Sequence, residues 1–382
     1  MMQAEDGTEV IDQEKVDAMV DVAIANGVNY FDTSPVYLKG ESESATAEAL
    51  SRYPRESYLL ATKLSIFGGN VTPEGAKAMY ERSLAIFSTD HIDYYLLHSL
   101  KDGADFKRRF LDTGLMDFFC GQRRLGHIRN LGFSFHGKAE GFTDILAYHE
   151  TYHWDFVQIQ MNYVDWRHAG GRNCNAEFLY SELDRREIPV VIMEPLRGGR
   201  LASLPALLTD RLLEADPGST PASWAMRFFA SYPRILTVLS GMSKMEHLEE
   251  NLRTFADFRP FSAEESAMVD SLAEDFLKYP LIRCTDCKYC MPCPYGIDIP
   301  GLLLYYNNSL LDGTYVVSED QKGYARARRK ALLKYGRAVE TVRQADHCTH
   351  CSQCVEHCPQ RIDIPKEIGK IDKYIEKLKL CR

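Results

Sequence analysis

Several features are scarce or absent in this 382-residue chain, and each absence excludes a class of protein. No apolar run approaches the roughly 20 residues that a membrane-spanning helix needs. The first ten residues, MMQAEDGTEV, are polar and acidic and lack the basic-then-apolar order of a secretory signal. The net charge of -9 argues against nucleic acid as a partner of the whole chain. We therefore expect neither a membrane protein nor a nucleic-acid-binding protein.

Cysteine, in contrast, is plentiful: the chain has 11. Eight of them fall into two tight clusters, at 284–293 and 348–358, while Cys120, Cys174 and Cys381 are scattered. Disulfides usually join residues that are distant in sequence and form in oxidising compartments. Crowded thiols in a chain without a secretory signal indicate metal binding in a reducing environment instead. We therefore expect a cytoplasmic metal-binding protein.

The first two-thirds of the chain alternates between short apolar runs and helical segments. Such alternation is typical of an α/β fold with a parallel sheet, whose strands are buried on both faces. The predicted strands are 28–33, 58–63, 92–99, 131–136, 155–164, 189–195 and 235–242. A closed (β/α)8 barrel needs eight strands, and the chain opens on a helix at 14–26, so the missing strand would be the first. Either the start has been lost or the barrel closes unusually.

Helix-start signals and a change in composition divide the chain. Ser243 with Glu246 and Ser262 with Glu265 have capping-box spacing and predict helices ending near 255 and 279. Beyond 283 the composition shifts to cysteine, proline and basic residues. We therefore predict a barrel over 1–258, a connecting helix or linker over 259–283, and an all-α domain over 284–382.

The cysteine-rich tail contains an internal repeat. Cys284, Cys287, Cys290 and Cys293 are spaced C-x2-C-x2-C-x2-C-P, and Cys348, Cys351, Cys354 and Cys358 are spaced C-x2-C-x2-C-x3-C-P. Each run is followed by I-D-I-P. In this pattern three close cysteines bind one [4Fe-4S] cluster and the cysteine before proline binds the other. We predict two clusters, one held by Cys284, Cys287, Cys290 and Cys358 and the other by Cys348, Cys351, Cys354 and Cys293.

Two structural zinc sites are the alternative interpretation of the tail. Zinc usually takes pairs of cysteines separated by a longer loop, which fits two runs of four cysteines poorly. The tail resembles an α-helical two-cluster ferredoxin domain.

Four residue types that suit carbonyl chemistry follow the first predicted strands. Asp32 ends one strand, Tyr37 lies in the next loop, Lys63 ends YLLATK, and His98 lies near the end of YYLLHS. The carboxyl ends of barrel strands form the active-site face. A tyrosine there can protonate a carbonyl that accepts hydride, and a lysine cation held by an aspartate would lower the tyrosine pKa. A histidine can donate a hydrogen bond to the substrate oxygen.

The motifs around these residues resemble those of the aldo-keto reductase superfamily. FDTSPVY, ATK, YYLLHS, GFSFHG, QIQMNYV, MEPLRGG and LSGMSKMEHLEENL look like its successive strand-end motifs over about 12–256. With the tail, the chain resembles the subgroup that has a C-terminal 4Fe-4S ferredoxin domain. The resemblance implies a (β/α)8 barrel, NADP(H) or NAD(H) as cofactor, and Asp32, Tyr37, Lys63 and His98 as the catalytic tetrad with Tyr37 as proton donor.

The same resemblance implies the nucleotide-binding residues. Ser134 and Gln160 would hold the nicotinamide carboxamide, Lys244 would meet a 2′-phosphate and Asn251 the adenine. Leu196, Gly198, Gly199, Ser240, Gly241 and Ser243 would lie along the phosphates, the last three at a helix start. The sequence departs from the family pattern at Phe135 and His136, which follow Ser134. It departs again at Met193 and Glu194, which stand where an aromatic residue often stacks on nicotinamide.

These observations predict an NAD(P)H-dependent oxidoreductase that acts on a small carbonyl or alcohol and carries two [4Fe-4S] clusters for electron transfer. The alternative is an electron-transfer or redox-sensing iron–sulfur protein that keeps the barrel as a scaffold. The basic stretch 324–337 suits docking of an acidic redox protein. It equally suits a solvated helix face.

Overall fold

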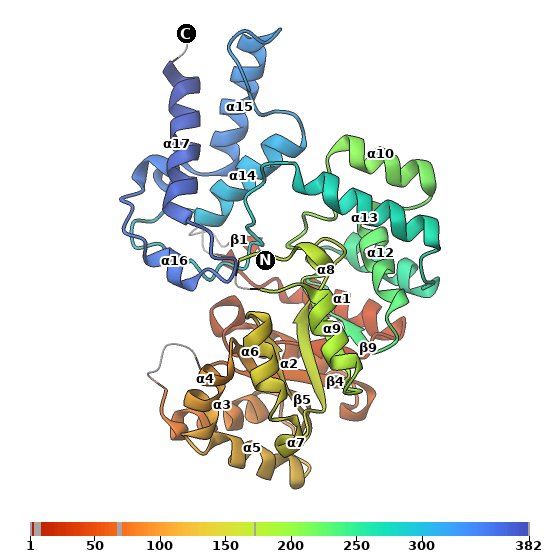
Figure 1. Ribbon diagram of the computed structural model, residues 1–382. Coiled ribbons are helices and arrows are strands. Elements are labelled where there is room, and N and C mark those ends of the chain that lie inside the picture. The colour runs from red at the N-terminus through yellow and green to blue at the C-terminus, as the bar shows by residue number, and fades with distance from the viewer. Residues whose placement is uncertain (1, 4–8, 67–70, 172, 381–382) are drawn as a thin grey trace.

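The computed structural model describes residues 2–3, 9–66, 71–171 and 173–380, so Cys381 lies outside the described residues. Within these ranges, seven parallel strands form one sheet in the order β3-β4-β5-β6-β7-β8-β9, which curves into the barrel of Figure 1. The strands are β3 Tyr30–Asp32, β4 Leu59–Leu64, β5 Ile92–Leu100, β6 Ile128–Phe135, β7 Phe156–Gln160, β8 Val190–Met193 and β9 Ile235–Val238. A separate antiparallel pair, β1 Met2–Gln3 and β2 Glu9–Val10, precedes them. The fold is a (β/α)8-type barrel followed by a helical unit.

Each predicted strand is present, and the consecutive order confirms the predicted parallel sheet. Among the described residues, β3 and β9 form the two edges of this sheet. Their residues are only partly buried or exposed, whereas every residue of β7 is buried. The helices beside the edge strands, α1 Gln13–Ala25 and α12 Met245–Ala256, contact each other and so bring the two edges together from outside.

The remaining helices of the first part surround the sheet (Figure 1). They are α2 Ser42–Leu50, α3 Pro73–Ile86, α4 Gly103–Phe106, α5 Leu115–Arg124, α6 Ala139–Leu146, α7 His149–Tyr152, α8 Asp165–His168, α9 Ala176–Asp184, α10 Ala206–Ala215, α11 Pro221–Arg227 and α13 Ala263–Leu277. In the described residues, no helix is long and apolar enough to span a bilayer.

Local capping chemistry explains where two of these helices begin. The Ser262–Glu265 capping box is confirmed at the start of α13, where each side chain accepts from the other's backbone N–H. The box predicted for Ser243 and Glu246 is wrong. Lys244 is the N-cap of α12 and makes no side-chain capping bond, because the helix begins at Met245. Ser243 therefore lies outside the helix.

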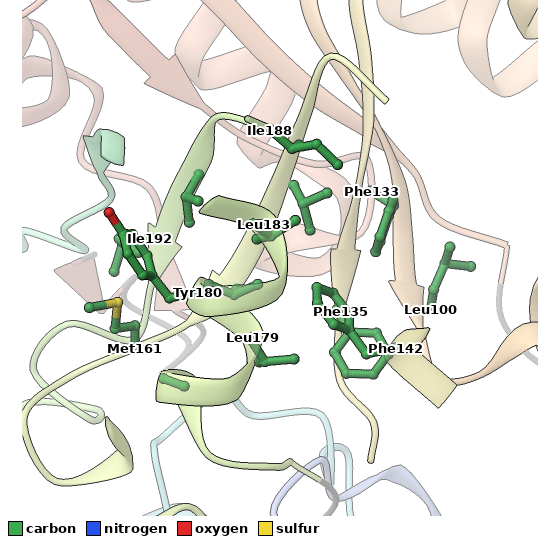
Figure 2. Packing of buried hydrophobic residues seen from close by; sticks show 14 of the residues in the cluster. Leu100, Phe133, Phe135, Phe142, Met161, Leu179, Tyr180, Leu183, Ile188 and Ile192 are labelled. Atoms are coloured by element: carbon green, nitrogen blue, oxygen red, sulfur yellow. The ribbon is translucent and has the colours of Figure 1, made fainter. Parts of the chain in front are cut away.

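The apolar core fills the space between the sheet and its helices. Figure 2 shows Leu179 and Leu183 of α9 packed near Phe135, Ile188 and Ile192, which come from β6, the turn before β8, and β8 itself. Burying one such leucine stabilises the fold by roughly 1.5–3 kcal/mol. The buried side chains of α13 belong to the same core, whereas a second core begins at 282. The barrel and its last helix therefore pack as one body.

The C-terminal unit is helical and repeats its construction. Its helices are α14 Ile299–Leu311, α15 Tyr324–Ala338, α16 Gln353–His357 and α17 Ile364–Leu380. Both copies of I-D-I-P begin a helix: Asp298 accepts from Gly301 N at 3.1 Å, and Asp363 accepts from Lys366 N at 3.3 Å. Aspartate caps the free N–H groups at a helix start, and proline fits its first turn. The duplicated motif is thus a duplicated helix start.

The C-terminal unit packs closely against the barrel at two glycines. A Cβ on Gly198 would lie 2.4 Å from Thr285 Cα, and one on Gly171 would lie 2.5 Å from the Gln360 carbonyl oxygen. Arg200 adds a hydrogen bond from Nη1 to the Ile282 carbonyl at 3.2 Å. Backbones that approach this closely leave no room for a side chain. The contact therefore fixes the cysteine-bearing segment against the mouth of the barrel.

Replacing one of these glycines tests this packing. Gly198 and Gly313 have φ of +67° and +64°, but a Cβ on Gly313 would meet nothing within 4 Å. Alanine at either site costs roughly 1–2 kcal/mol for its left-handed backbone. We expect Gly198→Ala to lose about 1–3 kcal/mol more, because Thr285 must move. Anaerobic thermal unfolding of both variants measures the difference in stability. Equal losses of stability would contradict the close packing of Gly198 on Thr285.

Candidate active site

A cavity of about 690 Å³ opens at the mouth of the barrel. Among the residues predicted for the site, those that line it are Asp32, Tyr37, His98, Ser134, Leu196, Gly198, Gly199, Ser240, Gly241, Ser243 and Asn251. The C-terminal unit contributes a second set: Thr285, Asp286, Cys287, Tyr289, Pro359 and Gln360. The cavity is therefore bounded by both parts of the chain.

Lys63 and Asp32 form an ion pair beneath the cavity. Lys63 is fully buried, and its Nζ lies 2.5 Å from Asp32 Oδ1 and 2.8 Å from the Thr33 carbonyl oxygen. Asp32 Oδ2 is buried without a hydrogen-bond partner among the described residues. Removing one member of a buried pair leaves an uncompensated charge, typically at a cost of about 3–5 kcal/mol. The pair therefore holds both side chains in place.

Tyr37 lies in the loop after β3, against Lys63 and His98. Lys63 Nζ is 4.7 Å from the centre of the Tyr37 ring, and the Tyr37 and His98 rings meet edge to face with centres 5.9 Å apart. The expectation that Lys63 lowers the tyrosine pKa is wrong for this arrangement. Burial, with the nearby charges of Asp32 and Glu194, raises the pKa of Tyr37. The hydroxyl therefore stays protonated at neutral pH.

His98 is held from behind by Ser65. Its Nδ1 lies 2.6 Å from Ser65 Oγ, which in turn lies 2.9 Å from Ser34 Oγ. Burial lowers the pKa of His98 well below its ordinary value, and the cations Lys63 and Arg109 act in the same direction. A neutral imidazole oriented in this way suits hydrogen bonding to a substrate oxygen.

Of the two residues predicted to hold the carboxamide, Ser134 lines the cavity and Gln160 does not. Ser134 Oγ accepts from Ser99 N at 2.8 Å and lines the cavity, so its proton remains to be donated. Gln160 is held away from the cavity by Asp165 and Asn173, at 2.6 and 2.7 Å. Gln158 lines the cavity instead, and its buried Oε1 has no hydrogen-bond partner among the described residues.

That unpaired oxygen is an acceptor that suits an N–H₂ group such as that of a carboxamide.

The other end of the cavity has the features of a phosphate and adenine site. Asn251 Nδ2 donates to Ser240 Oγ at 3.0 Å, and both residues line the cavity with Ser243. Ser243 precedes the start of α12, and a helix N-terminus favours anions. Lys244 is exposed and lies outside the cavity lining.

Glu194 is a site residue that the sequence marked only as a departure from the family pattern. It follows β8 with a left-handed backbone, φ +58°, and lines the cavity. Burial, together with Asp165, raises its pKa to about 7, while Thr285, Arg200 and Arg197 oppose the shift. Its Oε2 is buried without a hydrogen-bond partner among the described residues. The carboxyl group is therefore half-protonated near neutral pH.

The cysteines surround two further cavities. Cys284, Cys287, Cys290 and Cys358 line one, and Cys290, Cys293, Cys351 and Cys354 line the other, of about 340 Å³. The remaining cysteine, Cys348, interacts electrostatically with Cys354. Burial raises the pKa of the Cys284 thiol to about 12 and of Cys354 to about 11. Iron must therefore displace protons from these thiols when it binds.

The described residues contain no group of three or more His, Cys, Asp or Glu side chains close enough to hold a single metal ion. The thiols instead lie around the two cavities.

The two cysteine loops share a strained backbone. Asp286 and Lys288 have φ of 53° and 60°, and His350 and Ser352, at the same places in the second motif, have φ of 57° and 63°. Left-handed backbone costs an ordinary residue roughly 1–2 kcal/mol, and such strain concentrates at ligand sites. Two loops with the same strain, each presenting three thiols, fit two cubane clusters. The donor set is chemically right for iron–sulfur.

Comparison with known proteins identifies the family. A model of the aldo/keto reductase family matches residues 1–274. The chain belongs to the aldo/keto reductase family. A model of a 4Fe-4S dicluster domain matches residues 280–362, so this reductase carries an iron–sulfur domain. The predicted subgroup is thereby confirmed, and the protein is an oxidoreductase with iron–sulfur centres.

Individual relatives of this aldo/keto reductase are distant. An uncharacterized oxidoreductase, YqkF, of Bacillus subtilis is 24% identical over 300 residues, which is 69% of this chain and 89% of the relative. L-galactose dehydrogenase of Arabidopsis thaliana is 23% identical over 273 residues, covering 66% and 81%.

Among solved structures, aldo-keto reductase AKR11C1 from Bacillus halodurans matches 68% of this chain and 88% of its own, at a TM-score of 0.55 and 22% identity. An aldo-keto reductase from Klebsiella pneumoniae in complex with NADPH matches 68% and 85%, at a TM-score of 0.55 and 20% identity. These structures share the barrel fold.

The raised pKa of Glu194 predicts a pH-dependent stability. The folded protein holds this proton up to about pH 7, whereas an unfolded glutamate releases it near 4.5. Stability therefore falls as pH rises from 4.5 to 7, by at most about 3 kcal/mol at roughly 1.4 kcal/mol per pKa unit. We expect Glu194→Gln to be more stable than wild type at pH 8 and not at pH 4.5. Anaerobic unfolding at the two pH values measures this, and a pH-independent difference would contradict it.

Proposed function

We propose that the protein reduces a small carbonyl compound with NADPH or NADH, using Tyr37 as proton donor, and that it binds two [4Fe-4S] clusters. One observation supports the proposed carbonyl reduction. Asp32, Tyr37 and His98 line a single cavity, and Lys63 is paired with Asp32 directly beneath it. The four side chains come from β3, the loop after it, β4 and β5.

Each of the four side chains would have a separate role in reducing the substrate carbonyl. Bound nicotinamide would supply the hydride. His98 would donate a hydrogen bond to the substrate oxygen and orient it, and Tyr37 would transfer its proton to that oxygen as alkoxide character develops. Lys63 would stabilise the tyrosinate that remains, while Asp32 keeps Lys63 in position. Because burial raises the pKa of Tyr37, the hydroxyl carries the proton that this step transfers.

The nucleotide would lie between the two ends of the cavity. Ser134 and Gln158 would hold the carboxamide, and Leu196 and Gly199 would follow the diphosphate. Ser240, Gly241 and Ser243 would lie at the phosphates, with Asn251 at the adenine. Gly198 also lines this path, although its free face is covered by Thr285. Lys244, exposed beside the cavity, is the residue that would favour NADPH over NADH through a 2′-phosphate.

The two cysteine cavities support the predicted cross-pairing of ligands. The first contains Cys358 among three cysteines of the first motif. The second contains Cys293 with Cys351 and Cys354 of the second motif, and it shares Cys290 with the first cavity. Bound clusters would supply one-electron transfer. A small acidic redox protein in the cytoplasm is the partner we propose. Arg326, Arg329 and Lys330 support it, because they are exposed on α15 with no ion pair among the described residues.

Tyr37→Phe tests the tetrad. Loss of the proton donor is expected to lower carbonyl reduction by NADPH about 10²–10⁴-fold. Tyr95→Phe is the matched control, because Tyr95 is a buried core tyrosine whose hydroxyl has no hydrogen-bond partner among the described residues. Anaerobic NADPH oxidation with simple aldehydes measures both variants, at equal iron content. Unchanged turnover in Tyr37→Phe would favour the alternative of an iron–sulfur protein with a scaffold barrel.

Paired cysteine variants test the cluster assignment. Cys284→Ser and Cys358→Ser are each expected to remove the same cluster and so about half of the iron, because four thiolates are proposed to hold each cube. The double variant is expected to lose no more than either single variant. Cys120→Ser, in α5 of the barrel, is the control and keeps all the iron. Additive loss in the double variant, measured by iron analysis and the dithionite-bleached visible spectrum, would refute the cross-pairing.

A further inference from the structure

The end of β5 that carries His98 is not a regular strand. The residue pairs on either side of the irregularity are Leu97 with Phe133 and Leu100 with Phe135. The step from 97 to 100 on β5 is opposite the shorter step from 133 to 135 on β6, so β5 contains one extra residue there, a β-bulge. Ser99, inside the bulge, has a left-handed backbone with φ +56°. Bulges re-aim side chains and are common beside active sites.

This bulge fixes the positions of two site residues. His98 lies in it and lines the cavity, with its ring held by Ser65. The next residue, Ser99, donates from its backbone N to Ser134 Oγ at 2.8 Å, and Ser134 lines the same cavity. The backbone of two consecutive residues therefore determines where both the proposed donor to the substrate oxygen and the proposed carboxamide ligand lie.

Arg109 binds the carbonyl groups of the bulge. It follows β5 in the helical turn Lys107–Leu111, and its side chain is buried. Its Nη2 donates to the His98 carbonyl oxygen at 2.7 Å, and its Nη1 donates to the Ser99 carbonyl oxygen at 3.2 Å. Nη1 also lies 2.9 Å from Oδ2 of Asp105, which is buried too. Because this carboxylate balances the buried charge, the guanidinium is held in place.

The shape of the guanidinium matters as well as its charge. Buried carbonyl groups need donors, and a residue with a left-handed backbone persists where its surroundings hold it. Arg109 meets both needs, because one rigid planar group reaches two consecutive carbonyls. A lysine would present a single ammonium on a flexible chain, which cannot reproduce that fork. Arg109 is not among the described residues that line the cavity, so its influence on the site passes through the end of β5.

We propose that Arg109, held by Asp105, is a positioning residue of the active site. It sets the bulged end of β5 so that His98 faces the substrate oxygen and Ser134 faces the nicotinamide carboxamide. This inference rests on the proposed carbonyl reduction and adds a coupling to it, because one buried side chain aligns the substrate and nucleotide parts of the same cavity. A shift of this bulge would misplace the two reacting partners relative to each other.

Arg109→Lys tests this role by binding, without depending on turnover. The probes are NADP⁺ and 2′-phospho-ADP-ribose, which is the same nucleotide without nicotinamide. Each is titrated calorimetrically into the anaerobic, cluster-containing protein. We expect Arg109→Lys to bind NADP⁺ about ten-fold more weakly, because a hydrogen bond to the carboxamide is weakened, and to bind 2′-phospho-ADP-ribose as wild type does. Unchanged affinity for NADP⁺, or equal weakening of both probes, would overturn the inference.

Arg123→Lys is the matched control. Arg123 also binds two consecutive carbonyls and a carboxylate: it donates to the oxygens of Tyr152 and His153, each at 2.7 Å, and lies 2.9 Å from Asp155 Oδ2. Arg123 does not line the cavity, so we expect wild-type affinity for both probes. A loss of NADP⁺ affinity as large as that in Arg109→Lys would indicate general destabilisation and would count against the positioning role.

Crystal structures of the two variants test the geometry. In Arg109→Lys the hydrogen bond from Ser99 N to Ser134 Oγ is expected to be lost, whereas Arg123→Lys is expected to keep it. An unchanged bulge in Arg109→Lys would refute the inference whatever the probes show. If Arg109→Lys does not fold, Asp105→Asn replaces it under the same criteria. That variant is expected to weaken NADP⁺ binding about three-fold, because the guanidinium loses its counter-charge.

These outcomes are distinct from failure of the proposed reaction. A displaced bulge with selective loss of NADP⁺ affinity, but no turnover of aldehydes by NADPH in the wild type, would refute the reductase and leave the positioning role intact. Wild-type protein that binds 2′-phospho-ADP-ribose as tightly as NADP⁺ would instead refute the carboxamide site, and with it the part of the inference that concerns Ser134.

Discussion

The close approach of two backbones, at Gly198 in the barrel and Thr285 in the cysteine-rich unit, determines how the rest of the molecule is arranged. A methyl group would not fit between them. Because this contact fixes the segment that follows, it also fixes where Cys287 and Tyr289 lie relative to Tyr37. The active site of this aldo/keto reductase is therefore a property of the two units in contact, and neither unit alone encloses the cavity.

Burial dominates the electrostatics of the site. Lys63 forms an ion pair with Asp32, and the pKa of Tyr37 is raised by burial rather than lowered by this cation. The Tyr37 hydroxyl is therefore protonated. The same desolvation keeps His98 neutral and Glu194 partly protonated. A cavity with few net charges of its own responds strongly to any charge that enters it, since the effective dielectric constant inside is low.

The sequence predicted the strands, the order of the sheet and the positions of Asp32, Tyr37 and His98, because parallel strands must bring their carboxyl ends to one face. The sequence-based prediction was wrong where a residue pattern does not show which side chains reach the cavity. Gln158 and Gln160 lie on the same side of β7, and only the partners at the strand's end show that Gln160 is taken by Asp165 and Asn173.

Ser243 and Glu246 had capping-box spacing, but the helix began later. Tyr289 lies between two cysteines of the first motif, and the C-x2-C spacing does not indicate that its side chain lines the cavity.

The order in which the residues occur along the chain has a consequence for biosynthesis. Asp32 and Tyr37 are made early, yet Pro359 and Gln360, which complete the same cavity, and Cys358, which completes the first set of thiols, are made near the other end of the sequence. Domains generally fold as they leave the ribosome, N-terminal part first. The barrel is therefore made before the residues that close its mouth.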